Sequence, residues 1–580
     1  MLVFSGYPQF FHGVVLYMLF SLVSFPWESR IRYSRYAAFK RYLRSGAWAI
    51  AVCAGISAIQ WLPLLELTEH SHRKDGITVL IEIAAEYYIR GLMYSVDLAE
   101  SAWFFPITSS LLVCVLASAV GFSAKNNLRI IGHLVAVFIL VNLALAQQSP
   151  LYTFARSYEL IPGLSNFRAM FPYFYVAIFG LCIFAAKSLD WLSTTKLLHS
   201  TDARGGIMKL SLVLLFFVAW VCIICRYHIP EVSSFHYVTL GVAIAAVLAA
   251  NLTRSQFIIP AAAVAVLIVE AAVLRVAPFQ FVDNSILTTR PEAVALIEAD
   301  PDAADYKHYH ISQGGLAFVN PTKRDIESLA RDELNHIIAA TNLLWGIPSF
   351  TGAFALQSKR QVMLVEHVDA EIRGDAGQVA GLRLIDLLAI KYISMRQPTS
   401  SEAFETRIST REPRTLLFME NTAALPRFQT YRDVTVVGDS ENALATLKRQ
   451  KQKALVLETS DLIPAAHLKI SAQYSDQPRI KLTHDSPTSY KLATEADGPF
   501  WLFLADANYP GWRATVSGEA VQVYTAQILG KAVYIPAGSN EVEIYFESKS
   551  LKIGFLLAGL TLIGILLTFA INRFRTLRKG

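Results

Sequence analysis

The stretch ADANYPGWRATVSGEAVQVYTAQ, residues 505–527, alternates polar and apolar side chains on both sides of a Ser517-Gly518 pair. Alternation with a period of two is typical of a half-buried strand, and a Ser-Gly pair between two such runs is typical of a turn. The stretch therefore predicts a strand pair that faces water. It lies about twenty-five residues ahead of the last long apolar run of the chain, which indicates a β module tethered to a membrane.

The composition favours a membrane protein over a soluble enzyme of this size. Apolar residues make up 53% of the 580 residues and charged residues only 17%, and the mean hydropathy is +0.38. Such values are typical of a polytopic membrane protein. Long polar stretches between about 280 and 550 nevertheless indicate a large part of the chain in water.

Nine apolar runs are long enough to cross the hydrocarbon core of a bilayer, which needs roughly 17 to 25 residues. Because lipid offers the backbone no hydrogen-bond partners, each run is interpreted as a helix. The runs lie near residues 9–25, 47–65, 104–122, 128–146, 171–192, 207–225, 235–251, 256–275 and 551–571.

The positions of lysine and arginine set the predicted orientation, since cytoplasmic loops carry an excess of both. The loop after the first run is the most basic, and counting alternately from it keeps later basic segments, including the tail from Arg573 to Lys579, in the cytoplasm. The whole of 276–550 then faces outward, and so does Met1. Because no signal peptide precedes an exported Met1, the sequence favours a chain that lacks earlier helices.

The outward part changes its pattern along the chain. Residues 291–300 and 324–344 show the three- and four-residue apolar spacing of helices. Short alternating runs, which predict strands of a β-sandwich, follow at 360–368, 454–458, 478–485, 490–496, 500–509, 513–524, 532–538 and 541–548. The outward part contains no cysteine, so its stability must come from its own core rather than from disulfides.

The predicted fold is a polytopic α-helical membrane domain with a large extracytoplasmic α/β-to-β-sandwich domain and one C-terminal transmembrane helix. The predicted units are a multi-span membrane domain of about eight helices, an extracytoplasmic helical or mixed segment, an extracytoplasmic mainly β domain, the last transmembrane helix and a basic cytoplasmic tail. Their bounds are 1–275, 276–360, 361–550, 551–572 and 573–580.

Several motifs resemble one bacterial family in the same order along the chain. Tyr509, Pro510, Gly511 and Trp512 form a turn after a strand, and residues 536–538 read Pro-Ala-Gly before the last strand. Further matches are GYPQ at 6–9, AIQWLPLLELTEHSHR at 58–73, and GLSNFRAMFPYF at 163–174, which retains an arginine at 168. In these features the chain resembles the C-terminal portion of the YfhO family of membrane proteins, which have a GT-C-type glycosyltransferase architecture.

The resemblance implies a membrane glycosyltransferase in the bacterial cytoplasmic membrane. Such an enzyme takes a sugar from a polyprenyl-phosphate donor at the outer face and passes it to a surface glycopolymer or lipid acceptor. The family's catalytic carboxylate lies in the first outward loop, upstream of the matched residues, so the resemblance assigns no catalytic residue here. It leaves a divalent metal cofactor open.

Four residues are the candidates for substrate binding. A phosphate-linked donor needs cations near the headgroups, and sugar transfer needs a carboxylate to accept the proton of the acceptor. Glu66, Glu69 and Arg73 offer both in one outward loop, and Arg168 lies just before a later apolar run. Each also has a simpler interpretation, as a solvated loop charge or as an arginine that reaches from a span to the interface.

Two other motifs are better explained by structure than by function. His308 and His310 form a His-x-His pair whose rings would share one face of a strand, but no third ligand group at a fixed spacing supports a metal site. Trp512 could stack on a sugar ring, yet a tryptophan after a Pro-Gly turn more often anchors a core.

Two functional classes remain after the others are excluded. The predicted spans hold few ionisable residues, which disfavours an ion-coupled transporter, and the basic residues lie next to predicted spans, which disfavours nucleic-acid binding. The glycosyltransferase interpretation therefore stands beside a noncatalytic membrane-anchored scaffold or binding protein for cell-envelope polymer assembly.

Overall fold

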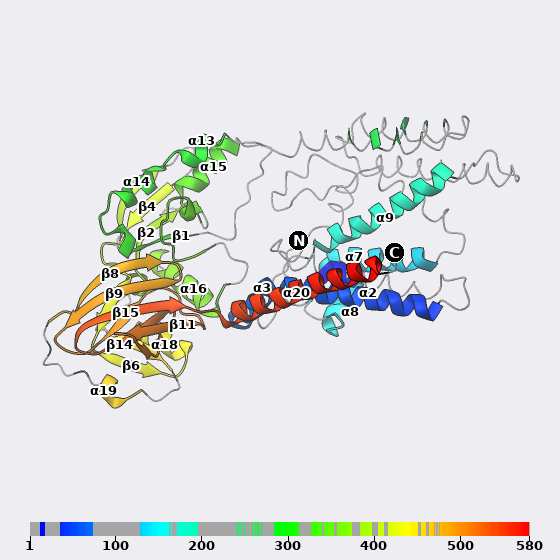
Figure 1. Ribbon diagram of the computed structural model, residues 1–580. Coiled ribbons are helices and arrows are strands. Elements are labelled where there is room, and N and C mark those ends of the chain that lie inside the picture. The colour runs from blue at the N-terminus through cyan, green and yellow to red at the C-terminus, as the bar shows by residue number, and fades with distance from the viewer. Residues whose placement is uncertain are drawn as a thin grey trace, which may run out of the picture.

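The computed structural model separates a β-rich part from a group of helices, and the helix α20 (Lys549–Leu577) leads from one to the other (Figure 1). The structure describes residues 12–17, 35–72, 128–161, 172–194, 283–311, 326–338, 341–352, 357–373, 383–396, 404–410, 416–450, 454–459, 463–468 and 476–578, with a few single residues between them. All structural statements below concern these residues.

Three sheets make up the β-rich part. The first has the order β1-β2-β4-β3 (Lys307–Ile311, Ile390–Met395, Leu416–Glu420 and Glu405–Thr410). The second has the order β5-β10-β14-β13-β7-β6 (Phe428–Tyr431, Phe500–Leu504, Gly530–Ile535, Tyr524–Ala526, Leu455–Glu458 and Val434–Val437). The third is antiparallel, with the order β12-β11-β15-β9-β8 (Glu519–Val521, Trp512–Val516, Gly538–Phe546, Ser489–Ala496 and Arg479–Ser486).

The strand pair predicted at 513–524 is confirmed as the hairpin β11–β12. Val516 lies opposite Glu519, so the two residues between them form the turn. Ser517 and Gly518 both have positive φ, 50° and 85°, as a type I′ turn requires. The polar and apolar alternation places Ala514 and Val516 in the core and leaves Arg513 exposed on the outer face.

The five-stranded sheet packs its inner face on the six-stranded sheet. Alternate residues of β10, Phe500, Leu502 and Leu504, are fully buried against Leu492 and Val516 of the five-stranded sheet. The intervening β10 residues Trp501 and Phe503 are equally buried on the reverse face, with Tyr431 and Leu455. The strand β10 is therefore covered on both sides, which explains why its sequence is continuously apolar.

The strand predicted at 360–368 is wrong, because this run lies in the helix α16 (Lys359–Arg373). Leu364, Val368 and Ile372 recur every four residues and are all fully buried beside the four-stranded sheet. Four-residue spacing places side chains on one face of a helix and not of a strand. The four consecutive apolar residues at 362–365, which resemble a short buried strand, concealed this longer period.

The helical predictions at 291–300 and 324–344 are confirmed by α14 (Glu292–Glu298), α15 (Ile326–Asn335) and the 3-10 helix η9 (Thr341–Leu344). The longest of the other helices of the β-rich part is the amphipathic α18 (Ser440–Arg449). The Asp439 side chain precedes it and accepts a hydrogen bond from the Asn442 amide, which caps its N-terminus. The remaining helices have three or four residues. They are α13 (Ser285–Thr288), η7 (Ala303–Asp305), α17 (Leu384–Leu387) and α19 (Ala465–Leu468).

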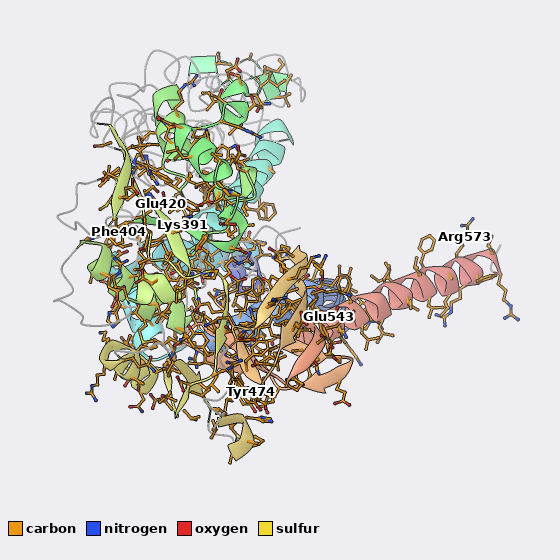
Figure 2. All side chains as sticks on the ribbon, turned by 90° about the vertical axis from the view of Figure 1, so that its left-hand side faces the viewer. Lys391, Phe404, Glu420, Tyr474, Glu543 and Arg573 are labelled. Atoms are coloured by element: carbon orange, nitrogen blue, oxygen red, sulfur yellow. The ribbon has the colours of Figure 1, made fainter. Side chains whose placement is uncertain are left out.

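One helix of the described residues is long and apolar enough to span a membrane. It is Lys549–Arg575, 27 residues within α20, and only 6% of its apolar window is buried by the rest of the protein. Figure 2 shows α20 projecting from the sheets, with Arg573 near its far end. The predicted C-terminal span has this counterpart by length and composition.

The predicted polytopic membrane domain, and with it the multi-pass localisation, is wrong. Among the described residues, α20 passes the length test for a span, and one further pair, Arg44–Ile56 with Ala58–His70, does so only as a single span bent by 70°. The apolar helices His133–Ala144 and Pro172–Ala186 are too short. The helices α7 (Leu128–Ala144) and α9 (Pro172–Thr194) pack on each other along one side, where Val137 lies beside Gly180.

Other predicted spans lie wholly or partly outside the described residues. They are those near 9–25, 104–122, 207–225, 235–251 and 256–275. The helical part that is described consists of residues 12–17 and a set of helices: α2 (Arg35–Ile56), α3 (Ala58–His70), α7, η4 (Ala146–Gln148), α8 (Pro150–Ser157) and α9.

The helix α3 joins the helical part to the sheets. It packs along α20, where Gly554 lies against the backbone of Ala58 and Ile59. At its end, Ser71 forms an antiparallel bridge with Ser358, and the His72 amide donates to the Gln357 carbonyl at 3.1 Å. These contacts hold the C-terminal end of α3 beside the start of α20.

Candidate functional site

A cavity of about 430 Å³ lies where the five-stranded sheet meets the start of α20. Glu66 contributes to its wall from α3, and the remaining lining comes from β11, β12, the end of β15, the segments that adjoin these strands, and the first residue of α20. The lining residues are Glu66, Pro510, Gly511, Trp512, Arg513, Ala514, Ala520, Val521, Gln522, Val523, Tyr545, Glu547 and Lys549. Apolar walls with a few charged groups are typical of a small-molecule site.

The turn at 509–512 forms the contact with α3. The Tyr509 ring meets the His70 ring edge to face, with 5.6 Å between centroids. Burial, and to a smaller extent the nearby Glu66 carboxylate, raises the pKa of Tyr509 to about 12. A Cβ on Gly511, whose φ is +116°, would lie 3.0 Å from the Glu547 carbonyl oxygen, so glycine allows this close approach.

Trp512 is both a core residue and part of the cavity wall. Its ring stacks on Tyr490 with centroids 5.7 Å apart and an interplanar angle of 19°. Phe546 contacts it from β15 at 5.6 Å, and the Lys531 Nζ lies 3.9 Å from its ring centroid. The core interpretation of Trp512 therefore holds, and the same packing fixes the ring at the cavity.

Cationic side chains lie on the side of the cavity next to α20. The Arg513 Nε donates to Glu547 at 2.7 Å, and Lys552 forms a second ion pair with Glu547. Lys549 lines the cavity at the first position of α20. Arg513, Lys549 and Lys552 carry three positive charges against the two negative charges of Glu547 and the lining residue Glu66, and this net charge of +1 favours an anionic group there.

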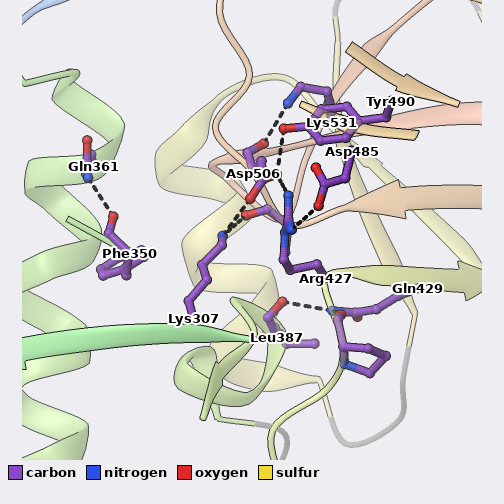
Figure 3. Close-up of polar contacts among 12 residues, drawn as sticks. Lys307, Phe350, Gln361, Leu387, Arg427, Gln429, Asp485, Tyr490, Asp506 and Lys531 are labelled. Carbon is purple, nitrogen blue, oxygen red and sulfur yellow. Dashed lines mark hydrogen bonds and ion pairs between the residues drawn. The ribbon is translucent and has the colours of Figure 1, made fainter. Parts of the chain in front are cut away.

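Figure 3 shows a buried charge cluster around Asp506; it contains Lys531, the cation that lies over the Trp512 ring. Asp506 is 3.2 Å from the Lys307 Nζ and 2.8 Å from the Arg427 Nη2. The Lys531 Nζ donates to the Asp506 carbonyl oxygen at 3.2 Å, and Tyr490 donates to the carboxylate at 3.0 Å. The cluster links β1 of the four-stranded sheet to the sandwich.

Burial and the neighbouring charges shift the pKa values of Asp506 and Lys531 in this cluster. Burial alone would raise the pKa of Asp506, but Lys307, Arg427 and Lys531 hold it well below its ordinary range. Burial lowers the pKa of Lys531 to about 7, although Asp506 opposes the change. Asp506 is therefore the counter-charge on which the buried cations depend.

The His-x-His pair lies on one face of β1, as the sequence predicts. The His308 Nε2 and His310 Nδ1 both donate to the Ser394 Oγ, at 2.9 and 3.0 Å, because that hydroxyl donates to the His336 carbonyl. The His308 Nδ1 is buried without a hydrogen-bond partner. Within the described ranges, no group of three or more histidine, cysteine or acidic side chains has the geometry to hold a metal ion.

We predict that this pair makes the protein less stable in acid. Burial is the main cause that lowers the pKa of His308 from 6.5 to about 3, and His336 adds to it. Burial also lowers the pKa of His310 to about 3. Above pH 6.5 both states are neutral. Below it the unfolded state binds protons that the folded state does not, so the free energy of unfolding falls by up to about 1.4 kcal/mol per pH unit for each histidine.

The measurement is chemical unfolding of the detergent-solubilised chain between pH 6.5 and 5. The variant His308→Gln keeps a donor for Ser394 but does not titrate, so its slope of stability against pH should be shallower than that of the wild type. An unchanged slope would contradict the prediction.

The structure describes two of the four predicted substrate-binding residues. Glu66 lines the cavity, whereas Glu69 is exposed on α3 and does not. Arg73 and Arg168 lie outside the described residues. The sequence missed the cavity residues Arg513, Tyr545 and Lys549 as candidates, although their alternation along β11 and β15 marks the first two as outward-facing.

Comparison with known proteins identifies no relative of this chain. The site rests on residues from α3, β11, β12, β15 and α20, which lie in distant parts of the chain. No protein-family model matches the chain, and no curated protein or solved structure is significantly similar to it.

Proposed function

We propose that the cavity binds a sugar carried on a polyprenyl phosphate and that the protein transfers it to a surface glycopolymer or lipid, as the resemblance to the YfhO family implies. The observation that carries the proposal is the convergence of Glu66, Trp512, Arg513 and Lys549 on one cavity at the start of the apolar helix α20. Such a position suits a ligand that is half in lipid and half in water.

The orientation proposed for the chain follows from its ends. Arg573 and Arg575 lie at the end of α20 and Arg578 and Lys579 follow it, against Lys549 and Lys552 at its start. The more basic flank of a span favours the cytoplasmic side. The sheets, at the opposite end of α20, would then be extracytoplasmic at the bacterial cytoplasmic membrane, which is where a polyprenyl-linked sugar meets its surface acceptor.

Each lining group suits one part of this ligand. Arg513 and Lys549 would neutralise the phosphate at headgroup depth, because cationic donors form the strong hydrogen bonds to phosphate oxygens. The Trp512 ring, held by its core neighbours, offers an apolar face for a sugar ring. Glu66 forms no ion pair with any described residue, so its carboxylate is available to the hydroxyl groups of donor or acceptor.

The proposed transfer replaces one bond to the anomeric carbon by another. The acceptor hydroxyl oxygen forms a bond to that carbon as the bond to the phosphate oxygen breaks. The electron pair leaves with the polyprenyl phosphate, whose charge Arg513 and Lys549 would stabilise. The hydroxyl proton passes to Glu66 as general base.

The noncatalytic alternative, a membrane-anchored scaffold for envelope polymers, has support in the same site. Trp512 is fixed by Tyr490, Phe546 and Lys531, and a rigid aromatic platform is sufficient for binding without chemistry. The two functions predict different effects of removing the Glu66 carboxylate. Sugar transfer should fall if the protein is the enzyme, whereas the scaffold would bind the donor without any transfer.

The test uses the full chain in lipid nanodiscs with a synthetic polyprenyl-phosphate glucose. We expect Glu66→Gln to lower sugar transfer to envelope glycan by about a hundredfold, the usual range for losing a general base. Lys549→Gln should weaken donor binding by about tenfold, roughly 1.4 kcal/mol. Glu69→Gln, three residues along α3 and outside the cavity, is the matched control and should change neither.

Three outcomes separate the interpretations. Transfer by the wild type that falls with Glu66→Gln supports the enzyme. Donor binding without transfer in the wild type supports the scaffold. If neither Glu66→Gln nor Lys549→Gln changes donor binding or transfer relative to Glu69→Gln, the cavity is not the site.

A further inference from the structure

A second hollow, of about 670 Å³, lies at the opposite end of the same sheet. Its walls come from the start of β8, the end of β9, the β11–β12 turn and the start of β15. The residues are Arg479, Ile480, Lys481, Ala493, Thr494, Glu495, Ser517, Ser539, Asn540 and Glu541. We refer to it as the distal groove.

Part of the distal groove and part of the cavity lie on the outer face of the sheet, along the strand β15. Along β15, Val542 and Ile544 point into the core, so Glu541, Glu543 and Tyr545 share the outer face. Glu541 lines the groove and Tyr545 and Glu547 line the cavity. These residues are four to six positions apart, which is roughly 13 to 20 Å at about 3.3 Å per residue; Figure 2 places Glu543, between them, near the base of α20.

The charges of the distal groove are balanced and unpaired. Arg479 and Lys481 lie on the edge strand β8, and Glu495 and Glu541 lie on the strands β9 and β15. Arg479 is directly opposite Glu495 in the strand register, yet none of the four forms an ion pair with another described residue. Because the two cations and the two carboxylates cancel, the groove has no net charge that would attract a polyanion or a polycation. Its donors and acceptors therefore suit a neutral ligand rich in hydroxyl groups.

The shape of the groove depends on small and fixed side chains. Ala493 is exposed between the pairing partners Lys481 and Glu541, so the centre of the groove has no large side chain. Asn540 at the rim is held in place, since its Nδ2 donates to the Pro536 carbonyl at 3.0 Å and its Oδ1 accepts from Ser517 at 3.2 Å. A polymer could lie over Ala493 with donors and acceptors on both sides.

We infer that the distal groove binds a neutral saccharide chain, the acceptor polymer, whose growing end reaches the cavity along the outer face of β15. The inference rests on the proposed function for the direction of the chain. Balanced donors and acceptors in the groove would bind sugar hydroxyls, while the sugar to be added is held separately by the cavity near α20.

The experiment measures binding of envelope polysaccharide, separated by anion exchange into neutral and acidic fractions, to the full chain in nanodiscs. The variant Ala493→Gln fills the centre of the groove without adding charge. The matched control, Ala445→Gln, makes the same change at an exposed position of α18. We expect Ala493→Gln to raise the dissociation constant for the neutral fraction about tenfold and Ala445→Gln to leave it unchanged.

Two results would overturn the inference: equal affinity of Ala493→Gln and Ala445→Gln for the neutral fraction, or wild-type binding to the acidic fraction alone. Binding of polyprenyl-phosphate glucose is measured on the same samples. Unchanged donor binding in Ala493→Gln and weakened donor binding in Lys549→Gln separate the groove from the cavity. Binding of polyprenyl-phosphate glucose therefore tests the proposed function, and binding of the polysaccharide fractions tests this inference.

Discussion

The variant Asp506→Asn is expected to lose about 3 to 5 kcal/mol of folding free energy, the usual result of removing one partner of a buried ion pair. Its carboxylate is the shared counter-charge of Lys307 and Arg427, whose side chains are 6% and 7% exposed. Asparagine keeps the shape but not the charge, so Lys307 would lose its carboxylate partner and Arg427 would keep only the more exposed Asp485.

Two companion variants separate the charge from other effects of the Asp506 substitution. Asp485→Asn, which removes a carboxylate 35% exposed and 3.0 Å from Arg427, should cost less than about 1 kcal/mol because water screens that pair. Lys531→Met should be nearly neutral, since an apolar side chain of similar volume removes a buried cation together with its desolvation cost.

Chemical unfolding of the solubilised chain, followed by tryptophan fluorescence, measures all three variants. The pH dependence gives a second check. Because the folded-state pKa of Asp506 lies below its ordinary value of 3.8, its contribution is present above that pH and is lost as the pH falls below it. An Asp506→Asn variant within 1 kcal/mol of the wild type, a bound set by exposed pairs, would refute the counter-charge role.

Replacing Gly554 by leucine is expected to separate α20 from α3. A Cβ at this position would lie 2.7 Å from both the Ala58 carbonyl oxygen and the Ile59 Cα. Both atoms belong to backbone, so no side-chain rotation relieves the contact and the helices must move apart. Overpacking of this kind costs about 1 to 3 kcal/mol, and the movement would carry Glu66 away from the cavity.

The matched control is Gly564→Leu on the same helix, where a Cβ meets no atom within 4 Å. Thermal unfolding in detergent and binding of polyprenyl-phosphate glucose are the two measurements. Gly554→Leu should lower both the melting temperature and the affinity, and Gly564→Leu should lower neither. Equal melting temperatures for the two variants would show that the close approach of α3 to α20 is not required.

The spacing of apolar residues along the sequence was sufficient to predict several helices and strands and misleading for others. The hairpin β11–β12 follows from alternation on both sides of Ser517-Gly518, and α20 follows from a long apolar run. The helix α16 was missed because its four consecutive apolar residues, 362–365, resemble a short buried strand. The apolar runs of α7 and α9 were predicted as spans because apolar composition does not distinguish a lipid-facing helix from one that packs on other helices.

The sequence by itself determined where local patterns place side chains: the outward face of β11 and β15, the turn at Ser517-Gly518, and the apolar length of α20. Only the tertiary structure decided that Glu66 would meet Trp512 and Arg513, and that Lys531 would be buried beside Asp506. The physical reason is that period and propensity act over a few neighbouring residues. The cavity and the charge cluster instead depend on how α3, β11, β14 and α20 pack, and packing brings together residues from opposite ends of the chain.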